Sequence, residues 1–275
     1  MIGLPPFPSY PEVSAIADWV ELTALAAGKA LSRGKLQNTL ARESSPVTLA
    51  EDAWSELKRR GDLFGATWPF EFDDAVLDVR KSGPSSTLYI FLTALSLREN
   101  VDAVGRELFE HCVADLVLAL TGTPGLRLGH PRRAPVPKSL AKAVGLYCEK
   151  SHEQRGPLSP LASDRDLGLD VTTWMSFADG RGCYVHFMGQ CATGADWREK
   201  LTELNPLKWK DHINWAVPPV RFFATPFVLL HEEFRRRSLD GGLILDRPRL
   251  MMLKEKIKLG RGLNGRLQRY CAQLY

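Results

Sequence analysis

The chain has 275 residues, of which 44% are hydrophobic and 25% are charged, values that suit a globular protein and exclude a disordered or fibrous one. The longest apolar run, around Val113–Leu120, is interrupted by Asp115 and is too short to cross a membrane. No basic segment precedes an apolar stretch at the N-terminus, so no signal peptide is expected. The five cysteines are scattered without a CxxC pair, which argues against disulfides or a zinc knuckle and for a reducing, cytoplasmic location.

The positive charge of the chain is concentrated near its C-terminus. The formal net charge is +4, which permits nucleic acid as a partner without requiring it. Six basic residues stand against the single acid Glu255: Lys254, Lys256, Lys258, Arg261, Arg266 and Arg269. This distribution predicts a basic C-terminal arm.

Residues 1–100 read as a helical region that carries no visible chemistry. Apolar spacing predicts helices over Glu12–Gly34, Leu49–Gly61 and Ser86–Arg98, with Thr48 as the N-cap of the second. The aromatic, proline-containing segment Trp68–Val79 favours a loop or a short strand. We interpret residues 1–100 as an accessory or partner-binding region and residues 101–275 as a separate α/β domain.

The α/β domain is expected to begin with two helices and a β-hairpin. Helical spacing covers Gly105–Gly122, where Gly122 is a natural stop, and a second helix is expected at Ser139–Gln154. Two strands, Leu169–Met175 and Cys183–Ala192, are joined by an Asp-Gly turn that is typical of a hairpin.

The rest of the domain alternates helices and strands. Asp196 is expected to cap a helix that runs through Leu204. A strand at Val220–Phe227, a helix at Leu229–Arg237 and a strand at Leu243–Asp246 follow. The arginines near this last strand lack the GxxxxGK[ST] pattern of a phosphate loop, so we interpret them as an edge that contacts phosphate at most.

A metal site that cleaves phosphodiesters needs oxygen ligands on neighbouring strands and a lysine beside them. Asp170 opens the first strand of the hairpin. Because side chains alternate between the faces of a strand, Gln190 and Ala192 share one face near the end of the second strand, and Cys191 points the other way. A thiol nucleophile made of Cys191 and His186 is disfavoured, because these residues face opposite sides of the sheet.

These elements resemble the PD-(D/E)XK nuclease superfamily. The resemblance rests on a helix with Phe109-Glu110, the run Asp166-Leu-Gly-Leu-Asp170, a hairpin ending in Gly189-Gln-Cys-Ala-Thr-Gly194, and Asp196-Trp-Arg-Glu-Lys200. It covers roughly residues 105–204. More narrowly, the region resembles bacterial restriction-endonuclease-like proteins in which glutamine replaces the strand acid and the lysine has moved to the next helix. The implied fold is a restriction-endonuclease-like mixed sheet flanked by helices.

The resemblance assigns a role to each motif residue. Asp170 is the central metal ligand, Gln190 and the backbone carbonyl of Cys191 are further ligands, and Glu110 is the acid on the helix. Ala192 stands where the family has lysine, so Lys200 takes that catalytic role. The implied activity is Mg²⁺- or Mn²⁺-dependent cleavage of nucleic acid, DNA in preference to RNA. The implied setting is a bacterial antiviral defence system, beside a sensor or ATPase subunit or as a homo-oligomer.

Each assignment has a structural alternative that the sequence leaves open. Asp170 fits a turn aspartate, Gln190 a strand-end amide, and Lys200 a solvated helix lysine. Glu107 lies one turn before Glu110 and fits the same position. Without a reachable lysine, the chain would be an inactive nuclease-fold subunit that binds nucleic acid or scaffolds a partner. Two neighbouring residues have open roles as well: Asp166 is either loop solvation or a ligand of a second metal, and Trp197 is expected to pack on the sheet.

Overall fold

A five-stranded mixed sheet lies at the centre of the computed structural model, which describes residues 3–81 and 86–275. Its strands, in the spatial order β10-β9-β7-β6-β4, are β4 (Leu126–Arg127), β6 (Val171–Met175), β7 (Val185–Cys191), β9 (Val220–Ala224) and β10 (Leu243–Leu245). β4, β6 and β7 are antiparallel neighbours, whereas β9 runs parallel to β7 and β10 parallel to β9. The expectation of an α/β fold with a mixed sheet is confirmed.

The β6–β7 hairpin forms as the alternation and the Asp-Gly turn predict. Val171 pairs with Gly189 and Met175 with Val185 in antiparallel register. Gly180, in the turn, has a φ of 65°, which a glycine adopts without strain. Both strands are slightly shorter than predicted, so Asp170 lies immediately before β6.

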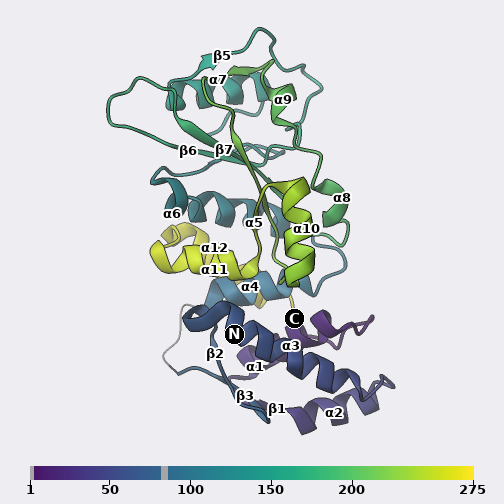
Figure 1. The fold of residues 1–275 in the computed structure, drawn as a ribbon. Coiled ribbons are helices and arrows are strands. Elements are labelled where there is room, and N and C mark those ends of the chain that lie inside the picture. Colours follow the sequence, from purple (N-terminus) through teal and green to yellow (C-terminus); the bar gives the residue numbers. More distant parts are fainter. Residues whose placement is uncertain (1–2, 82–85) are drawn as a thin grey trace.

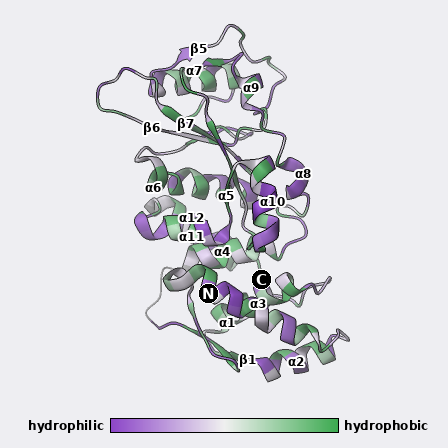
Figure 2. Cartoon of the chain, viewed as in Figure 1, coloured by the Kyte–Doolittle hydropathy of each residue, from purple (hydrophilic) through white to green (hydrophobic). Residues whose placement is uncertain are grey.

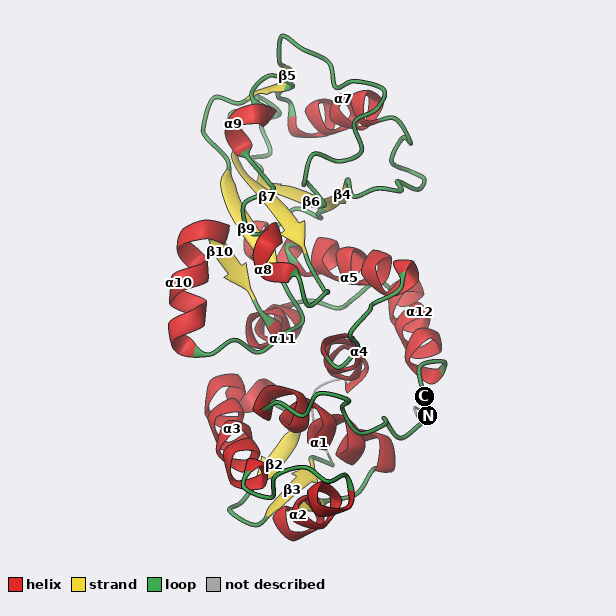
Figure 3. Ribbon diagram, turned by 90° about the vertical axis from the view of Figure 1, so that its right-hand side faces the viewer, coloured by secondary structure: helices red, strands yellow, loops and turns green. Residues whose placement is uncertain are grey.

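Helices cover both faces of the sheet, as Figure 3 shows. One face packs on α5 (Ala103–Leu116) and α11 (Arg247–Lys256), and the other packs on α8 (Trp197–Lys200) and α10 (His231–Gly241). Neighbouring residues of β9 show this division, because Phe222 packs in the core on the α5 face and Phe223 packs in the core on the α8 face. α10 is largely hydrophilic and presents most of its surface to solvent (Figure 2).

Gly189 allows β7 and β9 to pack closely on the α5 face. A Cβ at this position would lie 1.9 Å from the ring of Phe222. The glycine therefore makes room for an aromatic side chain on the adjacent strand.

A third core closes the far end of the sheet. It lies between β6, β7 and the segments α7 (Leu140–Ser151) and α9 (Pro206–Trp209), and includes Trp174 and Met188. β5 (Gln154–Arg155) and β8 (Ile213–Asn214) pair there as a small antiparallel sheet. This end lies at the top of Figure 1.

The N-terminal region contains a sheet as well as helices. Its elements are α1 (Val13–Ala27), β1 (Leu31–Ser32), α2 (Arg33–Arg42), α3 (Leu49–Phe64), η1 (Gly65–Thr67), β2 (Phe70–Phe72), β3 (Val76–Val79) and α4 (Ser86–Ser96). The predicted single helix Glu12–Gly34 is wrong, because Gly28 takes a left-handed conformation that ends α1. Thr48 occupies the N-cap position of α3, as predicted, although its side chain makes no capping hydrogen bond.

Three predictions for residues 101–275 have different outcomes. Gly122, with a φ of 73°, ends α6 (Leu118–Thr121), the short continuation of α5, as expected. Asp196 occupies the N-cap position of α8, as predicted, although its side chain makes no capping hydrogen bond, and α8 ends at Lys200 instead of running through Leu204. The predicted basic arm is folded: its residues lie in α11 and in α12 (Arg261–Ala272), with Lys258 between the two helices, and α12 packs on α4 and α5. No helix of the described chain is both long and apolar enough to cross a membrane.

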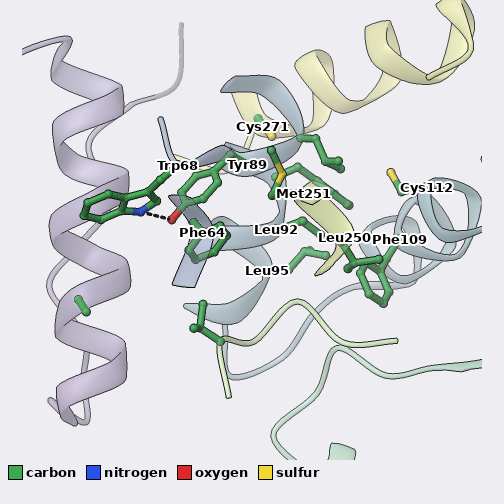
Figure 4. Packing of buried hydrophobic residues seen from close by; sticks show 14 of the residues in the cluster. Phe64, Trp68, Tyr89, Leu92, Leu95, Phe109, Cys112, Leu250, Met251 and Cys271 are labelled. Atoms are coloured by element: carbon green, nitrogen blue, oxygen red, sulfur yellow. Dashed lines mark hydrogen bonds between the residues drawn. The ribbon is translucent and has the colours of Figure 1, made fainter. Parts of the chain in front are cut away.

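One hydrophobic core extends from the N-terminal helices to the central sheet. Figure 4 shows Trp68 donating a hydrogen bond to the Tyr89 hydroxyl at 3.1 Å, beside side chains from α4, α5, α11 and α12. These side chains are Leu92, Leu95, Phe109, Cys112, Leu250, Met251 and Cys271. The boundary expected between residues 100 and 101 therefore passes between residues that pack in one cluster.

A buried ion cluster joins the same two regions. Arg247 of α11 lies 2.8 Å from Asp18, and Arg60 of α3 lies 2.6 Å from Asp18 and 2.8 Å from Glu21. All four side chains are nearly inaccessible to solvent. Burial alone would raise the pKa of Asp18, but the two guanidinium groups lower it to about 2.

We expect Arg247→Met to destabilise the chain by about 3–5 kcal/mol, because the change leaves Asp18 and Glu21 buried with one guanidinium fewer. The measurement is urea unfolding at neutral pH. Arg33→Met is the control, since Arg33 pairs with Glu51 at 3.1 Å on the surface, with 43% of its side chain exposed. Its cost should stay below about 1 kcal/mol. Equal costs for the two variants would contradict a structural role for the cluster.

Candidate functional site

Asp170 sits where β4, β6 and β7 meet. Its backbone N–H donates to Gly189, and its backbone carbonyl accepts from Leu128 and Gly129. Its side-chain Oδ2 accepts a hydrogen bond from the backbone N–H of Cys191 at 2.8 Å. These contacts fix the carboxylate at the end of the hairpin strands, partly buried.

Glu110 brings a second carboxylate to Asp170 from helix α5. An ideal Cβ on Gly129 would lie 2.3 Å from Glu110 Oε2 and 3.0 Å from Asp170 Oδ1. The two carboxylates therefore border one small space, which stays open because residue 129 has no side chain. We call Glu110 and Asp170 the acid pair.

The ambiguity between Glu110 and Glu107 is resolved by their contacts. Glu107 forms ion pairs with Arg133 at 2.9 Å and Arg266 at 3.2 Å, whereas Glu110 approaches the space at Gly129 beside Asp170. Burial would raise the pKa of Glu107, but the hydrogen bond and charge of Arg133 lower it overall. Glu110 is thus the acid that lies at the sheet end.

The acid pair is electrostatically unfavourable when both groups are charged. Burial and the nearby Asp166 and Glu107 carboxylates together raise the pKa of Glu110 to about 7, although the Arg127 guanidinium acts in the opposite direction. Burial and the neighbouring Glu110 carboxylate raise the pKa of Asp170 well above its usual range. Close carboxylates with raised pKa values are typical of catalytic and cation-binding sites.

Arg127 provides a cation beside the acid pair, and the sequence reading missed it. Its Nε lies 2.7 Å from Glu110 Oε2, yet both atoms lack the angles of a hydrogen bond and remain unsatisfied. We regard the contact as an ion pair, since 2.7 Å between opposite charges is attractive whatever the angle. The sequence held one signal for this contact: Arg127 stands between two leucines in a short strand, and a buried strand arginine needs an acidic partner.

Gln190 faces Glu203, a second residue that the sequence reading missed. Its Nε2 donates to Glu203 Oε2 at 2.6 Å, while its buried Oε1 has no hydrogen-bond partner within the described residues. A glutamate at position 190 would place two carboxylates at this distance. The contact gives a physical reason for an amide here, and it leaves one amide oxygen available to a ligand.

Lys200 and Ala192 have contacts of their own outside the acid pair. Lys200 Nζ is 3.4 Å from Asp196 Oδ2, and 33% of its side chain is exposed. Ala192 is buried in the core between β7, α8 and α10, beside Trp197, which packs against Phe227 as expected. Cys191 contributes its backbone N–H to Asp170, and a ligand role for its carbonyl stays a prediction.

Two further residues of the motif region have structural partners. Asp166 accepts hydrogen bonds from the backbone of His130 and Gly168, both at 3.1 Å, which suits a loop-stabilising role. His186 is buried and lies 3.0 Å from Glu153 Oε1, with Tyr147 at its other ring nitrogen. His186 packs against Tyr147 and Trp174 on one face of the sheet, and Cys191 packs against the core on the other face, as the alternation predicts.

The donor chemistry near Gly129 fits a hard divalent cation. Such ions take oxygen ligands, and Glu110 and Asp170 offer carboxylate oxygens beside Gly129. Across residues 3–81 and 86–275, no group of three or more His, Cys, Asp or Glu side chains is arranged to hold a metal. A cation here would therefore rest on two carboxylates, with amide, carbonyl or water oxygens completing its shell.

No protein-family model, curated protein or solved structure matches this chain.

We expect Glu110→Gln to change the pH dependence of stability in metal-free buffer. Between the ordinary pKa of 4.5 and the folded value of about 7, native Glu110 keeps a proton that the unfolded chain has lost. The free energy of unfolding of the parent protein therefore falls as pH rises through this window. Glutamine cannot ionise, so the variant should gain up to about 3 kcal/mol relative to the parent between pH 4.5 and 8.

Urea unfolding with a chelator, repeated across this pH range, measures the effect. Glu107→Gln is the matched control, because the pKa of Glu107 is lowered and its removal should act with the opposite sign. A flat difference between Glu110→Gln and the parent would mean that Glu110 is not held in an unfavourable charged state.

Proposed function

We propose that this chain is a metal-dependent nuclease that hydrolyses nucleic-acid phosphodiesters, DNA in preference to RNA. The observation that carries the proposal is the convergence of Glu110 and Asp170 on the space above Gly129. A mixed sheet with helices on both faces, which the PD-(D/E)XK resemblance implies, is a second support. A role as a defence effector beside a sensor or ATPase rests on the resemblance alone.

In this proposal, Asp170 and Glu110 hold Mg²⁺ or Mn²⁺, and the amide oxygen of Gln190 assists. Such a cation activates a water nucleophile and stabilises negative charge that develops on the phosphate. The backbone N–H of Cys191 fixes the orientation of Asp170. Glu203 holds the Gln190 amide so that its oxygen stays turned away from the carboxylate.

Lys200 is the proposed group that orients water or stabilises charge on the phosphate. To do so it must leave Asp196, its partner at 3.4 Å. Because the pair is partly exposed, breaking it costs at most about 1 kcal/mol. The flexible lysine stem then has to place the ammonium at the strand ends.

The contacts of Lys200 and Arg127 also favour a second candidate function. With Lys200 paired to Asp196 and a guanidinium already beside Glu110, the chain would be an inactive nuclease-fold subunit that binds nucleic acid or scaffolds a partner. Cleavage assays separate the two functions.

Asp170→Asn should reduce plasmid cleavage in Mg²⁺ or Mn²⁺ on the order of 100-fold or more, because the amide loses the charge that attracts a hard cation. The amide oxygen can still accept from Cys191, so the fold should remain. Nicking of supercoiled plasmid and circular dichroism measure the two effects. Asp179→Asn, on the exposed hairpin turn, is the control. Cleavage by Asp170→Asn at the parent rate would remove the acid pair as the active site.

Lys200→Ala should lower the cleavage rate on the order of 100-fold, the usual effect of removing one group that stabilises transition-state charge. Metal binding and nucleic-acid binding should persist. Lys208→Ala, at an exposed lysine of α9, is the control. Restoring lysine at position 192 is not a suitable rescue, because Ala192 is 2% exposed and its replacement would disrupt the core. If Lys200→Ala cleaves normally, another group acts on the phosphate.

A further inference from the structure

Two arginines from distant parts of the chain meet on one carboxylate beside the acid pair. Arg133, in the loop after β4, lies 2.9 Å from Glu107, and Arg266 of α12 lies 3.2 Å from the same carboxylate. Their side chains are 66% and 40% exposed, whereas that of Glu107 is 9% exposed. One buried negative charge thus holds two guanidinium groups that remain open to solvent.

The third group at the Glu107 carboxylate does not offset the positive charge of the two arginines. His111 also approaches Glu107, at 3.7 Å. An imidazole is neutral or positive, so this contact cannot cancel the charge of either guanidinium group. The cluster of Arg133, Arg266 and Glu107 therefore carries a surplus positive charge, and an anion from solution is its complement.

The arginine cluster lies next to the acid pair along α5. Glu107 precedes Glu110 by three residues, which corresponds to a rise of about 4.5 Å along the helix axis. Successive phosphates on one strand of a duplex rise by about 3.4 Å each. The two sites thus lie on neighbouring turns of α5, within the span of a few nucleotides of one backbone.

The exposed face of α12 is shaped for close approach. Gly262, Gly265, Arg266 and Arg269 fall on one side of the helix by their spacing, opposite the buried Leu267 and Cys271. A Cβ on Gly262 would meet no described atom within 4 Å, and one on Gly265 would meet only the tip of Arg269 at 3.6 Å. Packing within the described chain thus does not require glycine at either position, although alanine would favour the helix by about 1 kcal/mol.

We propose that Arg133 and Arg266, held by Glu107, bind the phosphodiester backbone of a nucleic acid and, with the glycine-bearing face of α12, guide it to the acid pair. The inference rests on the proposed function for its substrate, but it assigns a separate binding surface. A guanidinium binds a phosphate through two parallel N–H donors, and each exposed arginine has donors beyond those that Glu107 accepts. Glycines on the same helix face let the backbone lie close.

The test measures binding of the full chain to a short labelled DNA duplex in a chelator, where cleavage is blocked. Fluorescence anisotropy across about 50–200 mM salt gives the affinity and its salt dependence. The double variant Arg133→Gln, Arg266→Gln should weaken binding on the order of tenfold or more and reduce the salt slope by about 2. Arg33→Gln is the matched control, because Arg33 is 43% exposed and pairs with Glu51 at 3.1 Å. It should bind as the parent does.

Two single variants keep the test decisive. Arg133→Gln, on an exposed loop, reports on binding even if changes in α12 impair folding, and it should lower the salt slope by about 1. Gly265→Ala should raise the melting temperature and yet weaken binding several-fold, two effects that a purely structural glycine would not combine. Parent-like affinity in Gly265→Ala would overturn the role of the glycine face.

The outcomes also separate this inference from the proposed nuclease activity. Binding that depends on the arginines, without any cleavage in Mg²⁺ or Mn²⁺, supports the surface and refutes the activity. Cleavage by the double variant with parent affinity and salt slope refutes the surface and leaves the activity intact. A parent protein that binds polyglutamate but neither duplex nor single-stranded DNA would overturn the inference.

Discussion

Two guanidinium groups and two carboxylates meet in the interior, where α1, α3, α4 and α11 come together. Arg60 and Arg247 share Asp18 and Glu21, and Ser96 and Thr93 of α4 accept further donors of Arg247. Burying charges is favourable only when every partner is present, so the four helices must assemble together. α5, which carries Glu110, packs on α11, and its position at the sheet depends on this base.

The candidate site combines the opposite kind of electrostatics. In the ion cluster, the carboxylates contact guanidinium groups, and the pKa of Asp18 is low because Arg247 and Arg60 outweigh burial, although burial still raises the pKa of Glu21. In the acid pair, Glu110 and Asp170 repel each other, and both pKa values are raised. The protein thus uses its rigid interior to hold in place a pair of groups that would separate if they were free.

The sequence predicted what depends on local pattern. The hairpin followed from alternation and an Asp-Gly turn, and the helix stop at Gly122 from the tendency of glycine to end helices. The meeting of Glu110 with Asp170 was expected from the family resemblance and not from local pattern. Contacts between distant segments were not predictable in this way. Arg127 beside Glu110, Glu203 beside Gln190, and the packing of α12 on α4 and α5 arise only when the chain is folded. The same limit explains why Arg247 looked like part of a phosphate-contacting edge, although it is fully buried.

The guanidinium of Arg127 has a consequence for how the chain would respond to metal supply. In small zinc domains, the free energy of metal binding is the free energy of folding, so the protein is unfolded without its ion. Here Arg127 already offsets part of the charge of Glu110, and a proton on the acid pair offsets more. The site can therefore assemble with the rest of the fold before any cation arrives. For the proposed metal-dependent nuclease, scarcity of divalent ions would stop cleavage while the fold stays intact.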